Sequence, residues 1–339
     1  MCLGGETKTL TFKLTTVNSF GRIFRISIFG ESHGVSVGVV IDGCPPGIPL
    51  KVEDFDADLS RRKSGAKGTT PRQEADMPKL MSGVFNNFTT GAPLTIMFEN
   101  TNTKSGDYAQ FREVPRPGHA DFVAGKKYKG FEDYRGGGHF SARLTLGLVA
   151  AGVVAKKVID TINIKATLIE AGGMSDIDQA IEKAIVEQDT IGGIIECTAS
   201  NIPVGLGEPY FDSAEAMLSH MIFSIPATKG IEFGSGFAAA KMRGSEHNDA
   251  FVDLSGKTKT NYAAGINGGI TNGNDIVFRV AIKPTSSTPK TQQTMNFKTE
   301  QITDFVVQGR HDTCVALRAP VVVEAATAIV LADLKLMSE

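Results

Sequence analysis

The sequence contains no tryptophan and little cysteine. Its four cysteines are far apart in 339 residues, which leaves no CxxC pair, no zinc-knuckle spacing and too few thiols for a disulfide framework. We therefore expect a protein of the reducing cytoplasm. The four positions are Cys2, Cys44, Cys197 and Cys314.

An excess of charge of one sign is also lacking. The chain has 35 Lys and Arg residues against 37 Asp and Glu, and its pI is about 6.3. A dedicated nucleic-acid binder usually carries a strongly basic surface, so nucleic acid is not the expected partner.

Long hydrophobic runs are absent as well. The longest apolar stretch, residues 146–155, is about half of the ~20 residues that cross a bilayer, so we expect no membrane segment. Residues 1–17 lack the apolar core of a signal peptide and predict a disordered leader, with the fold beginning at residue 18.

Glycine, in contrast, is abundant, with 37 residues beside 14 prolines. It clusters next to Arg, His and Ser, where close backbone approach suits anionic ligands. No repeat or linker divides the chain, so we predict one large α/β domain over residues 18–339. The clusters are GESHG at 30–34, RGGGHFSAR at 135–143 and GINGGITNG at 265–273.

Strands and helices are predicted to interleave along the chain. Short β-branched or apolar runs bounded by Gly, Pro or Asn predict strands at 23–29, 35–41, 94–99, 193–198 and 276–282. Apolar residues at helical spacing predict helices at 53–63, 141–160, 177–187, 213–223 and 320–336.

The stretch from Arg135 to Arg143 is a Gly-rich loop that opens onto the predicted 141–160 helix. The amides at a helix N-terminus attract anions, and Arg135, Arg143 and Ser141 could add donors, so a phosphate or carboxylate fits. A capped helix with solvated arginines explains the pattern equally well.

A second basic cluster comprises Arg61, Arg62, Lys63, Lys67 and Arg72. It could neutralise a small polyanion, because arginine offers bidentate geometry to phosphate and carboxylate. Taken alone, it is as well explained by a solvated helix C-terminus.

Two histidines lie in Gly-containing turns, His33 in GESHG and His119 in RPGHAD. Imidazole titrates near neutral pH, so both are candidates for proton transfer, although a loop histidine is more often structural. No HExxH or similar spacing indicates a metal site, and none is predicted. Near the C-terminus, a loop could present Arg310 and Asp312 together.

Taken together, these motifs resemble one family, the chorismate synthases. GESHG with the following VSVGVVIDGCPPGIPL, then RPGHAD, YRGGGHFSAR, KPTSS and GRHDTC with VVVEAATAIVLAD occur in that family's order between residues 18 and about 334. The resemblance implies a β-α-β sandwich fold. It also implies a 1,4-anti elimination of phosphate from 5-enolpyruvylshikimate 3-phosphate to give chorismate, with reduced FMN required but no net redox change.

The resemblance also implies roles for particular residues. His33 matches a histidine near the flavin, His119 one near the leaving phosphate, and Asp312 a carboxylate that helps the flavin accept the substrate hydrogen. The implied substrate-binding residues are Ser32, Arg62, Lys67, Arg116, Arg143 and Arg310. The implied cofactor-binding residues are His139, Phe140, Ser141, Pro226, Ala227, Gly268, Lys283, Pro284, Thr285, Ser286, Ser287 and Arg310.

This chain departs from the family pattern at several places, including a loop near residues 67–68 that is one residue shorter than in some relatives and a short region between residues 165 and 193. Many members carry Arg-Ser where it has His139-Phe140, and arginine is frequent where it has Lys67. As partners the resemblance implies the small-molecule substrate, an external flavin reductase and assembly into a homotetramer. Two alternatives stay open: a flavoprotein oxidoreductase that consumes NADPH, and a polyanion-binding module without catalysis. No GxGxxG follows a predicted strand, which weighs against nicotinamide binding.

Overall fold

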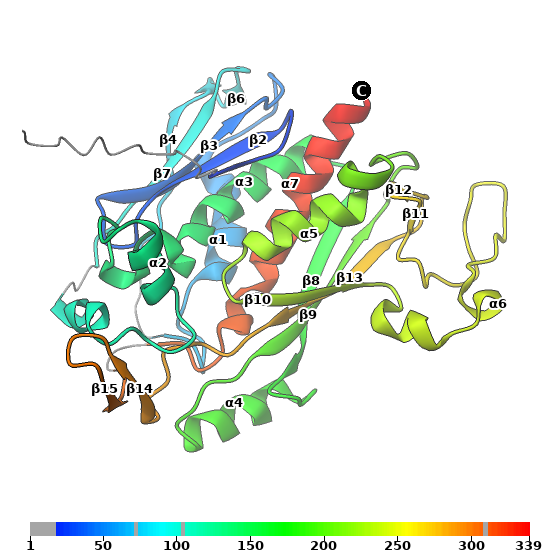
Figure 1. The fold of residues 1–339 in the computed structure, drawn as a ribbon. Coiled ribbons are helices and arrows are strands. Elements are labelled where there is room, and N and C mark those ends of the chain that lie inside the picture. The colour runs from blue at the N-terminus through cyan, green and yellow to red at the C-terminus, as the bar shows by residue number, and fades with distance from the viewer. Residues whose placement is uncertain (1–17, 71–73, 103–105, 308–310) are drawn as a thin grey trace, which may run out of the picture.

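Two antiparallel sheets enclose a layer of helices in the computed structural model (Figure 1). It describes residues 18–70, 74–102, 106–307 and 311–339, so the predicted leader over 1–17 lies outside it. The first sheet has five strands, in the order β1 (Ser19–Phe20), β2 (Arg25–Gly30), β3 (Ser36–Asp42), β7 (Leu94–Glu99) and β4 (Lys79–Ser82). The second has four, in the order β10 (Thr228–Phe233), β13 (Ile276–Ile282), β9 (Gly193–Ser200) and β8 (Asn163–Ala171).

Helix α3 (Thr145–Val158) packs on the first sheet, and α7 (Pro320–Ser338) packs between α3 and the second sheet. The two helices approach each other so closely that a Cβ added at Gly152 would lie 2.3 Å from the Cβ of Ala325. Small and β-branched residues of α7 are buried from Val321 to Leu334. The expected β-α-β sandwich is thus confirmed.

Two buried carboxylates fasten α7 to both layers. Glu324 accepts from both terminal nitrogens of Arg61, at 2.6 and 2.7 Å, and from the amide of Ala166 at 2.9 Å. Asp333 accepts from the backbone amides of residues 22–24, between β1 and β2. Burial works to raise the pKa of Glu324, but the hydrogen bonds from Arg61 and Ala166 outweigh it and lower the pKa.

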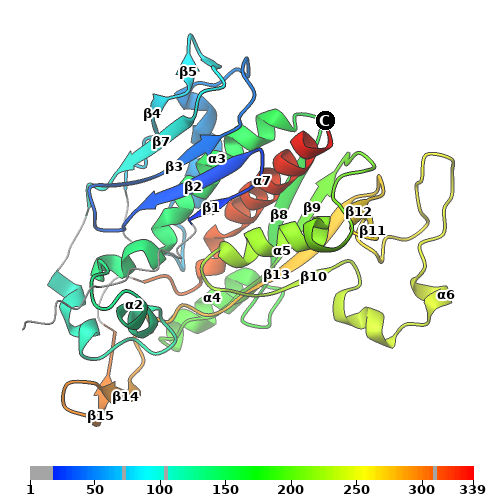
Figure 2. The same ribbon diagram turned by 45° about the horizontal axis from the view of Figure 1, so that its top comes forward.

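The remaining elements lie at the ends of the sandwich. Figure 2 shows α2 and the β14–β15 hairpin together at one end, and the long loop that carries α6 at the other. Among the described residues, no helix is both long and apolar enough to cross a membrane. The remaining helices are α1 (Asp56–Arg62), α2 (Asp121–Lys127), α4 (Ile177–Val186), α5 (Ala214–Ser224) and α6 (Gly244–His247); the small hairpins are β5 (Val84–Phe85) with β6 (Phe88–Thr89), β11 (Ile266–Asn267) with β12 (Ile270–Thr271), and β14 (Gln292–Asn296) with β15 (Gln301–Phe305).

Short 3-10 turns join several of these elements. The turns that matter for the site are η2 (Gly106–Arg112), η3 (Arg135–Phe140), η4 (Ala142–Leu144) and η7 (Val315–Arg318). The others are η1 (Val52–Phe55), η5 (Tyr210–Asp212) and η6 (Gly236–Lys241).

Candidate active site

The Gly-rich loop forms one wall of the site. Gly136, Gly137 and Gly138 all have positive φ, at 60°, 80° and 52°. A Cβ at Gly136 would lie 2.5 Å from Cδ2 of His33 and 2.8 Å from Oγ of Ser32. Glycine is required here because the loop backbone lies directly against the GESHG turn, so two motifs that are 100 residues apart come together.

We therefore expect Gly136→Ala to destabilise the protein more than Gly173→Ala. Both positions have positive φ, but nothing lies within 4 Å of a Cβ at Gly173, so that variant is the control for backbone strain alone. The extra crowding at Gly136 should lower the free energy of unfolding by about 1–3 kcal/mol more. Urea denaturation of both variants measures the difference, and equal losses would contradict the close packing of Gly136 against His33.

The predicted helix after the loop begins with a 3-10 turn. Ser141 caps this turn by accepting from the amide of Arg143 at 3.3 Å, and α3 follows directly. Arg143 is buried and donates to Asp76 at 2.9 Å, whereas Arg135 pairs with Asp133 and is 41% exposed. Of the two arginines that flank the glycines, only Arg143 lines a cavity.

A polar cavity of about 400 Å³ lies beside Arg143. It is lined by five basic side chains and three carboxylates among the described residues, so its fixed charge is positive. The basic residues are Arg62, Lys63, Arg116, Arg143 and Arg318, and the acidic ones are Glu74, Asp76 and Asp312.

Arg62 lies at the buried end of this cavity. Burial, together with the neighbouring Arg318 and Arg143, lowers the pKa of its guanidinium to about 10, although the Asp76 carboxylate opposes the shift. Arg62 is still charged at neutral pH, and its Nε is buried with no hydrogen-bond partner among the described residues. Asp76 itself has a φ of 50°, a region that costs free energy for a residue with a side chain. This arrangement favours an anion that would offset the surplus positive charge.

His119 stands beside this cavity and is held by two charged neighbours. Its Nδ1 lies 2.6 Å from Oδ1 of Asp121, and Nε of Arg116 donates to Oδ2 of the same carboxylate at 2.8 Å. Burial works to raise the pKa of Asp121, but hydrogen bonds from Arg116 and His119 hold it well below its usual range. Arg116 also donates to Oγ of Ser287 at 3.2 Å, which connects the RPGHAD and KPTSS motifs.

A second cavity, of about 530 Å³, continues from the first. It extends along the end of β10 and the residues that follow β13. Thr228 and Thr285 line it, and their buried hydroxyls have no hydrogen-bond partner among the described residues. Ala227 on its wall has a φ of 73°. Burial and the nearby Lys229 lower the pKa of Lys283, whose Nζ donates to the carbonyl oxygen of Gly118 at 2.8 Å.

The two cavities share part of their lining, so they form one site with two halves. Seven residues border both: Arg116, Gly136, Ser141, Ala142, Thr285, His311 and Asp312.

Most residues implied as cofactor-binding border the larger half. They are His139, Phe140, Ser141, Pro226, Ala227, Lys283, Pro284, Thr285, Ser286 and Ser287. Gly268 instead lies in the turn between β11 and β12 and lines neither half.

The implied substrate-binding and catalytic residues are also largely brought together. Arg62, Arg116, Arg143 and Asp312 line the smaller half, whereas exposed Lys67 pairs with Glu182 and lines neither half. Arg310 lies outside the described residues. His33 and Ser32 are buried behind Gly136, and the His33 ring meets the edge of Tyr108 with ring centroids 5.0 Å apart.

Sequence reasoning missed several residues that the fold adds to the site. Asp76, Tyr108 and Arg318 line the smaller half but belong to none of the quoted motifs. Asp121 ends RPGHAD, so its proximity to His119 in the sequence was a signal for a pair. Oδ1 of Asp312 accepts from the amide of Thr70 at 2.9 Å, and Oδ2 accepts from Arg318.

Three of the four cysteines lie in the described part of the chain, and all three are buried. Burial raises the pKa of the Cys197 thiol to about 12 and that of Cys44 to about 11, and burial also raises the pKa of Cys314. Across all the described residues, no group of three or more His, Cys, Asp or Glu side chains is arranged to hold a metal ion.

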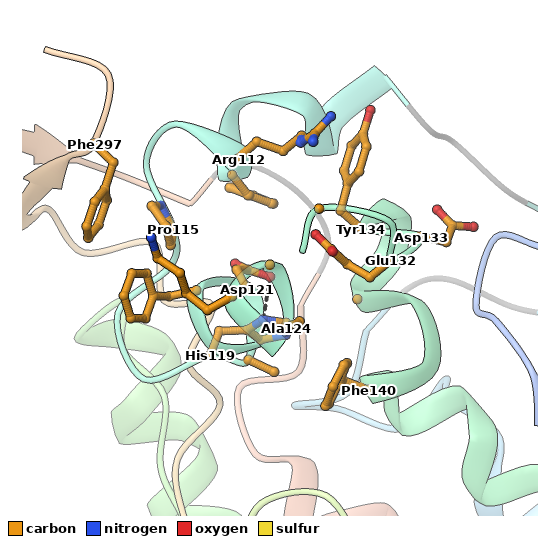
Figure 3. A pocket seen from close by; sticks show the side chains of 17 residues that line it. Arg112, Pro115, His119, Asp121, Ala124, Glu132, Asp133, Tyr134, Phe140 and Phe297 are labelled. Carbon is orange, nitrogen blue, oxygen red and sulfur yellow. Dashed lines mark ion pairs between the residues drawn. The ribbon is translucent and has the colours of Figure 1, made fainter. Parts of the chain in front are cut away.

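A third cavity, of about 240 Å³, lies on the other side of His119. Figure 3 shows the His119–Asp121 pair within it, with Arg112, Tyr134 and Phe297 around it. Phe297, in the β14–β15 connection, stacks on Phe122 of α2 with ring centroids 5.2 Å apart, so the hairpin closes this end of the site.

Comparison with known proteins agrees with the motifs. The family model described as chorismate synthase matches residues 24–336. The chain is 64% identical to the chorismate synthase of Chitinophaga pinensis over 324 residues, covering 95% of this chain and 98% of the relative. It is 47% identical to that of Dehalococcoides mccartyi over 351 residues, covering 94% and 96%. A solved structure, described as the crystal structure of chorismate synthase, is similar with a TM-score of 0.71 at 26% identity, covering 94% of this chain and 93% of that one.

Proposed function

Because this chain belongs to the chorismate synthase family and is a carbon–oxygen lyase, we propose that it converts 5-enolpyruvylshikimate 3-phosphate to chorismate. The reaction breaks the bond between C3 and the phosphate oxygen and removes a hydrogen from C6, in a 1,4-anti sense. A second ring double bond forms and inorganic phosphate leaves, with no net redox change. Residues 18–339 would act in it as one domain.

The observation that carries this proposal is the surplus of buried positive charge in the smaller half of the site. The substrate has a phosphate and two carboxylates, and Arg62, Arg116 and Arg143 are 6%, 6% and 8% exposed. Charge–charge attraction is much stronger away from bulk water, so these arginines can hold a polyanion although the chain as a whole is slightly acidic.

His119 and Arg116 are placed to assist the departing phosphate. A phosphate that leaves from carbon carries developing negative charge, and a positioned cation with a proton donor lowers the barrier to its departure. We assign the proton to His119 and the fixed charge to Arg116.

The larger half of the site fits reduced FMN. Its orphaned hydroxyls at Thr228 and Thr285 can donate to a polar group, Lys229 and Lys283 can neutralise a phosphate, and Phe140, Pro226 and Val315 offer apolar contact to a ring. When bound, reduced FMN supplies the electron density that makes this elimination feasible.

The remaining assignments are also proposals. Asp312 borders both halves, where its carboxylate would help bound reduced FMN to accept the hydrogen lost from C6. His33 would hold a proton close to the cofactor, from its position behind Gly136. Ser32, which is next to His33 in the sequence, would contribute to substrate binding. Close packing of the loop on both residues keeps water from this wall of the site.

Anaerobic incubation with the substrate and chemically reduced FMN tests the proposal. We expect chorismate and phosphate in equal amounts, with the flavin still reduced at the end. Stoichiometric NADPH consumption with transfer of hydride to a substrate would instead support an oxidoreductase. Neither product from intact substrate and active flavin would overturn the lyase reaction.

Family membership also supports three further proposals: assembly into a homotetramer, a supply of reduced flavin from an external reductase, and a cytoplasmic location. Analytical ultracentrifugation tests the first. The second requires that the protein alone does not reduce FMN with NADPH, and NADPH-dependent flavin reduction by the purified chain would contradict it.

A further inference from the structure

We propose that Asp121 is a positioning residue that fixes the Nδ1–H tautomer of His119, so that Nε2 is the nitrogen that exchanges a proton with the reacting phosphate. The second clause rests on the proposed function, whereas the first is a property of the folded protein. Asp121 begins α2 and belongs to no role assigned above.

The position of the proton follows from the distances and charges. Nδ1 of His119 and Oδ1 of Asp121 form an ion pair at 2.6 Å, a contact that favours a hydrogen on Nδ1. Asp121 is ionised at neutral pH because its pKa is held low, so the hydrogen belongs to Nδ1. Nη2 of Arg116 carries two hydrogens, of which one is donated to Oδ1 at 2.8 Å and the other faces Nδ1 at 3.1 Å, but the ionised carboxylate is the nearer partner of Nδ1.

The opposite edge of the ring lies against the Gly-rich loop at Gly137, which lines the third cavity. A Cβ at Gly137 would lie 3.5 Å from Cε1 and 3.7 Å from Nε2 of His119. Nε2 is thus the free position of the ring, next to the Gly-rich loop, while Nδ1 is occupied on the α2 side. His119 is 23% exposed and Asp121 9% exposed, so water competes weakly for the pair.

The same carboxylate orders the neighbouring cation. Asp121 accepts from both Nε and Nη2 of Arg116, and the guanidinium lies 4.3 Å from the ring centroid of Phe111. One buried carboxylate therefore sets the orientation of both the proton donor and the fixed charge. Figure 3 shows that Asp121 reaches His119 from the first turn of α2, a rigid element.

Other charged groups also face His119 and set the background against which Asp121 acts. In the larger half these are Lys229, Lys283, His311 and Asp312, together with Arg116; on the side of the third cavity they are Arg112, Lys126, Glu132 and Asp133. Of these described groups, Arg116 is the one that forms a hydrogen bond with His119, and Asp121 is the carboxylate that pairs with it. The removal of Asp121 should therefore affect the ring most strongly.

Nitrogen-15 NMR of histidine-labelled protein tests the tautomer without turnover. The His119 signal is assigned by its loss in His119→Gln. At a pH at which the ring is neutral, we expect this signal to show a protonated Nδ1 and an unprotonated Nε2. A protonated Nε2 with a free Nδ1 in the unmodified protein would overturn the proposal, whether or not the protein makes chorismate. In Asp121→Asn we expect the two tautomers to mix.

The pH profile of turnover gives a second readout. Asp121→Asn removes a negative charge 2.6 Å from Nδ1, which destabilises the imidazolium. We expect kcat to fall roughly 10- to 10³-fold and the alkaline limb of its profile to move to lower pH. A purely structural role for Asp121 would lower kcat at every pH and leave the limb in place.

Asp333→Asn is the matched control. Asp333 is a buried carboxylate that accepts several hydrogen bonds, but it lines none of the three cavities. Its loss should reduce stability without moving the alkaline limb or the His119 signal. A limb that moves equally in both variants would contradict a specific role for Asp121.

Discussion

His119→Ala is expected to lower kcat by roughly 10- to 10⁴-fold, the range for loss of a positioned acid or base. The reason is local: His119 lines the larger half of the site, where it pairs with Asp121 and lies next to Arg116, which borders both halves. Single-turnover rates with reduced FMN in excess measure the loss, because they separate the chemical step from product release.

His247→Ala is a suitable control for the removal of a histidine. His247 ends α6, where its Nε2 lies 3.1 Å from Oγ of Ser235, and it borders none of the three cavities. We expect it to retain the original rate. If His119→Ala folds normally and turns over at that same rate, His119 is not the proton donor.

Arg62→Met is expected to reduce kcat/KM by about 10² or more while leaving the melting temperature nearly unchanged. Truncating one partner of a buried charge pair weakens the binding of a ligand by about 2–5 kcal/mol. The fold should tolerate the change because Asp76 keeps its bond to Arg143 at 2.9 Å, and because Arg62 is crowded by Arg143 and Arg318. The surplus charge that destabilises the ligand-free site is the charge that we propose binds the substrate.

Inorganic phosphate provides a test that needs no turnover. Binding to the native state alone raises the melting temperature, so phosphate should stabilise the unmodified protein and should stabilise Arg62→Met much less. Arg25→Met is the control, because Arg25 is 53% exposed and pairs with Asp42 far from the arginine cluster. Equal stabilisation of all three proteins would remove Arg62 from the anion site.

The sequence predicts the interior of both sheets and misses their edges. The predicted strands correspond to β2, β3, β7, β9 and β13, which each have a neighbour on both sides. The missed strands β1, β4, β8 and β10 are the edge strands of the two sheets. In an edge strand such as β8, NIKATLIEA, only two of the nine residues are buried, so its apolar pattern is too weak to identify. All five predicted helices are present within a few residues, although 53–63 and 141–160 begin as 3-10 turns.

The site divides in a similar way between pattern and fold. Motifs located the loops, because Gly-rich segments beside Arg and His are visible in the sequence and resemble one family. Which charges pair was not predictable: Asp76 reaches Arg143 across 67 positions, and Arg116 reaches Ser287 across 171. Such contacts depend on how the two sheets and α3 are arranged, and no local spacing encodes that arrangement. The roles of the individual residues stay predictions.

The place of α7 between the layers also determines when the molecule can fold during its synthesis. This helix follows in the sequence every strand that it packs against, and Asp333 bonds to amides as far as 311 positions earlier. A growing chain on the ribosome therefore carries both sheets before the helix that fills the space between them has emerged. Until residues 320–338 are available, the inner faces of β8 and β9 have no complete partner, so folding is completed only after those residues have been made.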